Sequence, residues 1–123
     1  MTNPTKNSFR TAVESGEFLI TAEVAPPKGG NPDHMVKMAQ TLKDRVHAIN
    51  ITDGSRAVMR MSSWAASVIL RQQGIEPICQ VACRDRNRIA LQADLMGINA
   101  LGIGNILALT GDPVKAGDHP DAK

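Results

Sequence analysis

Apolar and polar positions recur along the chain in two different patterns. Four short apolar runs, centred near residues 20, 49, 79 and 107, are each closed by glycine, proline or small polar residues, which is typical of strands. The segments between them carry apolar residues three and four positions apart, which is the spacing of a helix that buries one face. The pattern therefore predicts strands that alternate with amphipathic helices.

The last apolar run is the most uniform of the four. Ile106-Leu107-Ala108-Leu109 contains no polar side chain, and Thr110-Gly111-Asp112-Pro113 closes it. Such an uninterrupted run predicts a parallel strand that is buried on both faces. The expected strands are residues 18–24, 47–52, 77–83 and 106–109.

Residues 11–15 are expected to form a short helix or turn, and three longer helices are expected to cover the sheet with their apolar stripes. The first begins after Asn31, with Pro32 in its first turn, and runs to about residue 44. The second lies within residues 56–73, and the third runs from a cap at Asp85 to near Gly97. The residues expected to face the core are Met35, Met38, Ala39 and Leu42 in the first helix and Ile89, Ala93 and Met96 in the third.

Alternating strands and helices imply right-handed crossovers and a parallel sheet, so the expected fold class is α/β. Two architectures fit four parallel (β/α) repeats: a small doubly wound sheet, or roughly half of a (β/α)8 TIM barrel. The 123 residues stop just after the fourth strand, which favours the half-barrel. The expected organisation is a polar N-terminal lead-in over residues 1–17, a half-barrel with the catalytic portion over residues 18–113, and a truncated loop or tail over residues 114–123.

Composition and charge exclude several classes of function. The chain has 14 basic and 12 acidic residues, and a net charge of +2 is too small to indicate nucleic acid or a membrane surface as a partner. No apolar run is long enough to span a bilayer and the first residues are polar, so a cytoplasmic protein is expected. Cys79 and Cys83 share a face of one expected strand, which favours two reduced, packed thiols. No histidine stands at zinc-ligand spacing from them, so no metal site is expected.

Polar side chains stand at the carboxyl ends of the expected strands, where α/β proteins place ligands and catalytic groups. These side chains are Glu23, Thr52 with Asp53, Gln80 and Asp112. Glu23 lies inside the end of an apolar strand, and a buried carboxyl kept neutral there suits a general acid; the alternative is an exposed glutamate at a sheet edge. Arg84, Arg86 and Arg88 could hold an anion, although such residues more often form a solvated helix start.

Three motifs stand in order along the chain. They are Glu23-Val24-Ala25-Pro26-Pro27-Lys28-Gly29, Cys83-Arg84-Asp85-Arg86-Asn87 and Asn105-Ile106-Leu107-Ala108-Leu109-Thr110-Gly111-Asp112-Pro113. Together they resemble the amino-terminal half of the methylenetetrahydrofolate reductase family, from about residue 18 to residue 123. The resemblance implies a (β/α)8 barrel that binds FAD at the carboxyl ends of its strands and reduces 5,10-methylenetetrahydrofolate to 5-methyltetrahydrofolate.

The resemblance also implies roles for single residues. Glu23 matches the glutamate held to be the acid that helps open the imidazolidine ring to the reactive iminium. Asp112 matches an aspartate near flavin and pterin, where a negative charge stabilises that cation. The implied flavin contacts are Thr52, Gln80, Thr110, Gly111 and Asp112. The chain departs from the usual family residues at Ala25, Gln80, Ala82 and Thr110, and Gln80 stands where many members have a histidine.

Family members continue beyond a fourth strand, so the resemblance implies that this chain is truncated. The 123 residues alone are then expected to be inactive and to bind FAD poorly. The expected partners are a folate, an electron donor such as NADH, NADPH or another carrier, and a second copy or a partner subunit. Two alternatives stay open: a pterin-binding methyltransferase-type barrel without flavin, and a non-catalytic half-barrel that serves as an interaction module.

Overall fold

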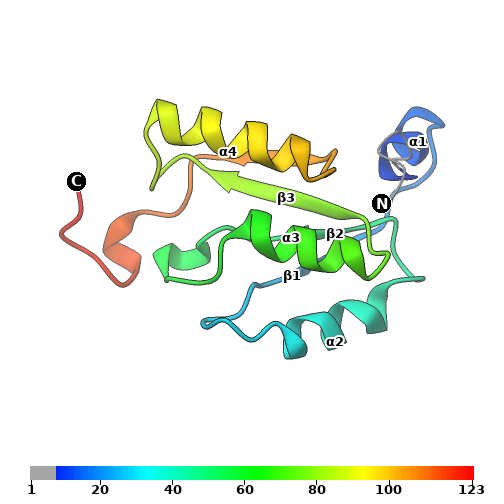
Figure 1. Ribbon diagram of the computed structural model, residues 1–123, viewed down its shortest axis with the longest axis horizontal. Coiled ribbons are helices and arrows are strands. Elements are labelled where there is room, and N and C mark those ends of the chain that lie inside the picture. The colour runs from blue at the N-terminus through cyan, green and yellow to red at the C-terminus, as the bar shows by residue number, and fades with distance from the viewer. Residues whose placement is uncertain (1–7) are drawn as a thin grey trace.

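The computed structural model describes residues 8–123. Helix α1, Ser8–Glu14, therefore falls within the expected polar lead-in, whose residues 1–7 lie outside the described part. In Figure 1 α1 lies at the opposite end of the molecule from the C-terminus.

Four parallel strands form one sheet in the sequential order β1–β2–β3–β4. Their bounds are β1 Thr21–Val24, β2 Ala48–Ile51, β3 Pro77–Ala82 and β4 Ile106–Leu109. Consecutive parallel neighbours are the arrangement of successive units of a (β/α) barrel, whereas a doubly wound sheet reverses its strand order. The predicted α/β fold is confirmed, and the sheet is consistent with part of a (β/α)8 barrel.

Three helices connect the strands: α2 Asp33–Leu42, α3 Ser63–Gln72 and α4 Arg88–Ala100. Two short turns of 3-10 helix, η1 Ser55–Ala57 and η2 Val114–Ala116, follow β2 and β4 and contact each other. The arrow of β3 in Figure 1 points toward the end of the molecule that holds η2 and the C-terminus. The carboxyl ends of the parallel strands and the loops after them therefore share one end of the molecule.

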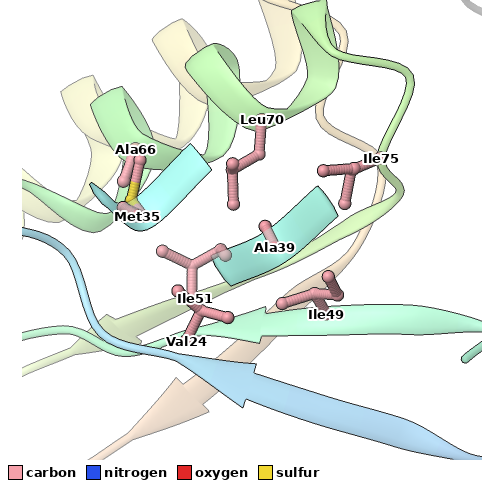
Figure 2. Close-up of a cluster of buried hydrophobic side chains, with 8 residues drawn as sticks. All are labelled: Val24, Met35, Ala39, Ile49, Ile51, Ala66, Leu70 and Ile75. Carbon is pink, nitrogen blue, oxygen red and sulfur yellow. The ribbon is translucent and has the colours of Figure 1, made fainter. Parts of the chain in front are cut away.

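The hydrophobic core lies on the face of the sheet that the helices cover. There, side chains of β1 and β2 pack against α2 and α3, as Figure 2 shows. This cluster consists of Val24, Met35, Ala39, Ile49, Ile51, Ala66, Leu70 and Ile75. A second cluster joins β3 to α4 and consists of Cys79, Val81, Ile98 and Ile103. Every second side chain of a strand points to the same face, so the opposite face receives the residues between them.

Part of the expected helix packing is wrong. Met38 of α2 is 49% exposed, and in α4 Ile89 and Met96 are 77% and 74% exposed. The pair Leu91 and Ile98 packs on β3 instead. Positions two apart lie about 200° apart around a helix, so a helix that buries Leu91 turns Ile89 to solvent. Apolar spacing alone identified the helix but did not choose between its two apolar stripes.

The start of α4 also differs from the prediction, whereas α3 lies within its expected range of residues 56–73. Asn87, not Asp85, caps α4, because its side-chain oxygen accepts a hydrogen bond from the amide of Ala90 at 2.9 Å. Helix α3 begins only at Ser63, after η1 and an extended stretch that includes Val58. Local capping and loop geometry, rather than apolar periodicity, decide where these helices start.

Strand β4 is exposed, and the prediction that it is buried on both faces is wrong. Ile106 and Leu107 are 40% and 42% exposed, whereas β3 is buried along its whole length. Within residues 8–123 β4 is the edge of the sheet, with β3 as its neighbour. Burial on both faces needs layers on both sides of a strand, and the clusters of buried side chains stop at β3 and α4.

Both cysteines are free thiols. Cys79 is buried on the helix-covered face, and this burial raises the pKa of its thiol. Cys83 follows β3 and is exposed, so the expectation of two packed thiols holds for Cys79 alone. Among the helices of residues 8–123, none has the length and apolar character needed to cross a membrane.

Candidate functional site

A pocket of about 290 Å³ lies at the carboxyl ends of the strands. Its lining comes from all four strand ends and consists of Glu23, Thr52, Asp53, Ser55, Gln80, Leu109, Thr110, Gly111 and Asp112. The residues that the sequence analysis assigned to a site are Glu23, Thr52, Gln80, Thr110, Gly111 and Asp112. The structure thus brings all of them together, although they come from segments that lie far apart in the sequence.

Strand alternation turns the pocket residues to the face opposite the helices. Glu23 stands in register with Asn50 of β2, two positions before Thr52. A row of polar side chains crosses this face, because Gln80 Nε2 donates to Asn50 Oδ1 at 3.4 Å and Asn50 Nδ2 donates to Thr21 Oγ1 at 3.5 Å. This row orients the amide of Gln80 at the wall of the pocket.

Thr52 carries an unsatisfied hydroxyl. The residue is 5% exposed, and within residues 8–123 its Oγ1 is buried without a hydrogen-bond partner. Such atoms are rare in native proteins, because an unpaired buried hydroxyl costs about 1–3 kcal/mol. Thr52 also lines the pocket, so the unpaired hydroxyl belongs to a residue of the candidate site.

Glu23 differs from the expectation of a buried carboxyl. It lines the pocket but is exposed, because β1 is the other edge strand of the sheet in the described residues. The alternative, an exposed glutamate at a sheet edge, is the one that the structure shows. Its carboxyl is accessible to a ligand in the pocket.

Asp112 follows β4, and a strained turn supplies a partner for its carboxylate. The backbone amide of Arg56 donates to Asp112 Oδ2 at 2.6 Å. Arg56 and Ala57 have φ values of 60° and 57°. This left-handed conformation costs a non-glycine residue about 1–2 kcal/mol. Strain of this kind is concentrated at functional sites, where the surrounding structure holds it in place.

Asp53 also lines the pocket, but its carboxylate is already paired. Its Oδ2 accepts hydrogen bonds from the amide of Ala82 at 2.7 Å and from Arg86 Nη1 at 2.6 Å. The side chains of Asp53 and Arg86 are 10% and 16% exposed, and Arg86 also binds Asp94 of α4 at 3.0 Å. Asp53 therefore joins the end of β2 to β3 and α4. Nowhere in residues 8–123 do three His, Cys, Asp or Glu side chains gather as a metal site.

The bonding of Arg84 and Arg86 differs from the prediction. The expectation of a solvated helix start is wrong for both, since their side chains are 10% and 16% exposed, and it holds for the exposed Arg88. Arg84 pairs with Asp85, and the hydrogen bond from its guanidinium lowers the pKa of that carboxyl. Their spacing could have indicated this. Two arginines that stand two positions apart directly after a buried strand point to the same side, and both side chains here extend back over the strand ends.

Comparison with known proteins gives one family. The family model described as methylenetetrahydrofolate reductase matches residues 8–123, which is most of the chain. A search of curated proteins finds no significant match. The chain belongs to the methylenetetrahydrofolate reductase family. Membership implies an oxidoreductase with a folate substrate and a TIM-barrel fold, and the parallel sheet is consistent with part of that barrel.

Proposed function

We propose that the pocket at the strand ends is the flavin and folate site of a reductase that converts 5,10-methylenetetrahydrofolate to 5-methyltetrahydrofolate. The observation that carries the proposal is the buried, unpaired hydroxyl of Thr52 in a pocket that also holds Glu23 and Asp112. A polar pocket with an unsatisfied donor at the ends of parallel strands is where an α/β barrel binds its ligand.

The residues present fit the ring system of FAD. Thr52 offers one hydrogen bond to a ring oxygen or nitrogen, and Gln80 presents a carboxamide at the same wall. Gly111, at φ 95°, adopts a backbone conformation that favours glycine and lies in the lining of the pocket between Thr110 and Asp112. Ligand pockets usually measure about 300–1,000 Å³. A pocket of about 290 Å³ suits the isoalloxazine ring rather than the whole dinucleotide.

Bound FAD supplies hydride transfer between an electron donor, NADH, NADPH or another carrier, and the folate. Asp112 then places a carboxylate, oriented by the amide of Arg56, beside the pocket. A fixed negative charge stabilises positive charge that develops on the folate during ring opening. Thr110 and Gly111 bring this carboxylate to the pocket from the end of β4.

Glu23 is proposed as the acid that protonates the folate nitrogen released on ring opening. It is exposed at the pocket and has no arginine or lysine within ion-pair distance among residues 8–123, so its carboxyl is accessible to a ligand. A positioned general acid contributes about 10²–10⁴-fold to a rate. Two carboxyls in different surroundings, one bonded to an amide and one open, suit two different roles.

The sheet is open beside the pocket, since β1 and β4 are both edges of the described sheet. Leu107 and Leu109 of β4 stand at that open side, and Leu107 is 42% exposed. A flavin bound there would keep much of its surface in water. We therefore expect residues 8–123 by themselves to hold FAD weakly and to show no turnover, and a tight stoichiometric complex of these residues alone contradicts this expectation.

The test separates the two half-reactions in the intact protein with FAD bound. We expect Glu23→Gln to keep FAD and its reduction by the electron donor within twofold, and to lower reoxidation by the folate at least about 100-fold. The matched control is Glu17→Gln, an exposed glutamate outside the pocket, which leaves both half-reactions unchanged. Equal loss of both half-reactions in Glu23→Gln overturns the assignment of Glu23.

The same preparation distinguishes the alternatives. Wild-type protein that binds a folate but never shows flavin absorbance or FAD binding supports the methyltransferase-type barrel and overturns the flavin proposal. Protein that binds neither ligand but sediments as a stable complex with itself supports the interaction module.

A further inference from the structure

We propose that Arg84 is a positioning residue that sets the direction of the Asp112 carboxylate by holding together the loops after β2 and β4. The contact geometry carries this inference, and only its consequence for turnover rests on the proposed function. Arg84 stands just beyond the end of β3, between the two loops that it joins.

The guanidinium of Arg84 donates a hydrogen bond to one backbone carbonyl in each of the two loops. Its Nη1 donates to the carbonyl oxygen of Asp112 at 3.1 Å, and its Nη2 donates to that of Gly54 at 3.2 Å. The backbone amide of Arg84 also donates to the carbonyl of Thr110 at 3.0 Å, which continues the β3–β4 ladder beyond the strands. Arg84 thus binds the segment after β4 at two points, Thr110 and Asp112, and the loop after β2 at one, Gly54.

Both loops have a glycine at the place where Arg84 passes. A Cβ on Gly54 would lie 2.7 Å from Arg84 Nη2, and a Cβ on Gly111 would lie 3.0 Å from Arg84 Cβ and 3.2 Å from its Nη1. Both glycines have positive φ, 57° and 95°. Two independent loops therefore adopt a conformation and a residue type that admit this one guanidinium.

A neighbouring carboxylate fixes the plane of the guanidinium. Asp85 accepts hydrogen bonds from Arg84 Nε at 2.9 Å and from Nη2 at 2.5 Å. The fork of an arginine is planar and rigid, so a pair with Asp85 on one edge aims the remaining N–H groups at the two loops. A lysine has one nitrogen and cannot reproduce this arrangement of donors.

These contacts converge on Asp112. Arg84 holds its carbonyl oxygen, and the amide of Arg56 holds its carboxylate at 2.6 Å. The loop that presents the Arg56 amide begins at Gly54, whose carbonyl Arg84 also holds. Loss of Arg84 releases both ends of this arrangement, so the Arg56–Asp112 hydrogen bond is the first contact to open.

The test is hydrogen exchange of the Arg56 amide in the free protein, which requires neither FAD nor activity. We expect Arg84→Met to speed this exchange at least tenfold, while the amides of Ile49 and Ile51 in β2 change less than twofold. Arg88→Met is the matched control, because Arg88 is exposed and lies four positions further along. It leaves the Arg56 amide unchanged.

Arg84→Lys keeps the positive charge and much of the aliphatic side chain. It tests the proposal if Arg84→Met destabilises the whole chain. We expect it to speed exchange of the Arg56 amide with β2 unchanged. An unchanged Arg56 amide in either folded variant overturns the proposal. Equal acceleration of the Arg56 and β2 amides in both variants also overturns it, because Arg84 then stabilises the fold without positioning Asp112.

Turnover gives a second readout that depends on the proposed function. In the intact protein with FAD bound, we expect Arg84→Met to lower the rate of folate reduction at least tenfold and to leave the KM for the folate within threefold. If no variant or wild-type protein reduces the folate, the proposed function fails, whereas the exchange experiment still decides the role of Arg84. Selective loss of Arg56 protection with normal folate reduction overturns the link to turnover.

Discussion

The two faces of the sheet use alternate residues of the same strands and differ in how their side chains are bonded. On the helix-covered face, Ile51 of β2 is 0% exposed and packs in the main core cluster. One residue further along, Thr52 is 5% exposed on the pocket face, and its hydroxyl has no partner within residues 8–123. These two side chains are almost equally buried, but only the one on the helix-covered face leaves no polar atom without a partner.

This difference separates residues that stabilise the folded state from features that lower its stability. The helix-covered face is apolar, and even its buried hydroxyls are bonded, as Ser63 Oγ donates to the carbonyl of Gln80 at 2.6 Å. The pocket face retains an unpaired hydroxyl and, at η1, a turn with two non-glycine residues at positive φ. Folding alone favours neither feature, so they point to the side of the sheet where a ligand binds.

The comparison is tested most strongly by two substitutions at neighbouring positions of β2. We expect Ile51→Ala to lower the free energy of unfolding by about 3 kcal/mol, because it removes a fully buried side chain and leaves a cavity against α2 and α3. Asn50→Ala, on the pocket face, is expected to cost less than about 1 kcal/mol, since its side-chain hydrogen bonds are long, at 3.4 and 3.5 Å. Urea denaturation with linear extrapolation measures both, and equal losses contradict the distinction between the faces.

The fold was predictable from the sequence because the strand and helix periodicities are local. The alternation in β2 placed Ile49 and Ile51 on one face and Asn50 and Thr52 on the other, and the register confirms a continuous parallel sheet. It did not choose the buried stripe of α4 or the exposure of β4. Those depend on which layers are present beside an element, and the same apolar residues suit a covered strand and an uncovered edge.

The lining of the pocket was also predictable, since the ends of parallel strands meet at one edge of a sheet. The bonding within it was not. Asp53 and Asp112 both follow strands in turn-like sequences, but Asp53 is paired with Arg86 and Asp112 accepts an amide from Arg56. Contacts between loops decide which carboxylate is already paired within the protein. The positive φ of Arg56 cannot be predicted from the pattern of apolar residues.

A smaller effect, with opposite signs on the two faces, is expected from removing single buried hydroxyls. Thr52→Val removes an unpaired hydroxyl, so we expect the free energy of unfolding to rise by about 1 kcal/mol. Ser67→Ala removes a hydroxyl that donates to the carbonyl of Ser63 at 2.7 Å, and we expect a loss of about 1 kcal/mol.

The affinity for FAD then distinguishes an effect on ligand binding from an effect on stability in the same two variants. We expect Thr52→Val to weaken FAD binding about tenfold, the equivalent of one lost hydrogen bond, and Ser67→Ala to leave it unchanged. Titration of the intact protein with FAD, followed by flavin fluorescence, measures both. A destabilised Thr52→Val protein with unchanged FAD affinity would show that the hydroxyl serves the fold.

The smallest effect is expected just beyond the end of β3, where Asp85 pairs with Arg84. The hydrogen bond from Arg84 lowers the pKa of Asp85 below its usual value of 3.8. A lowered pKa in the folded state means that the pair stabilises the protein above the pKa of the unfolded chain and loses this contribution as the pH falls through the folded value. Because the side chain of Asp85 is 57% exposed, solvent screens the pair, and we expect Asp85→Asn to cost less than about 1 kcal/mol at pH 7.

The pH profile distinguishes this pair from a general effect of charge. The stabilities of wild-type protein and Asp85→Asn, measured by urea denaturation, are expected to differ at neutral pH and to converge as the pH falls through the lowered pKa of Asp85 in the folded state. Asp44→Asn, an exposed aspartate after α2, serves as the control. A difference for Asp85→Asn that shows no dependence on pH would mean that the carboxylate charge of Asp85 is not what stabilises this contact. In that case the orientation of Arg84 depends on its backbone contacts with Gly54 and Asp112 alone.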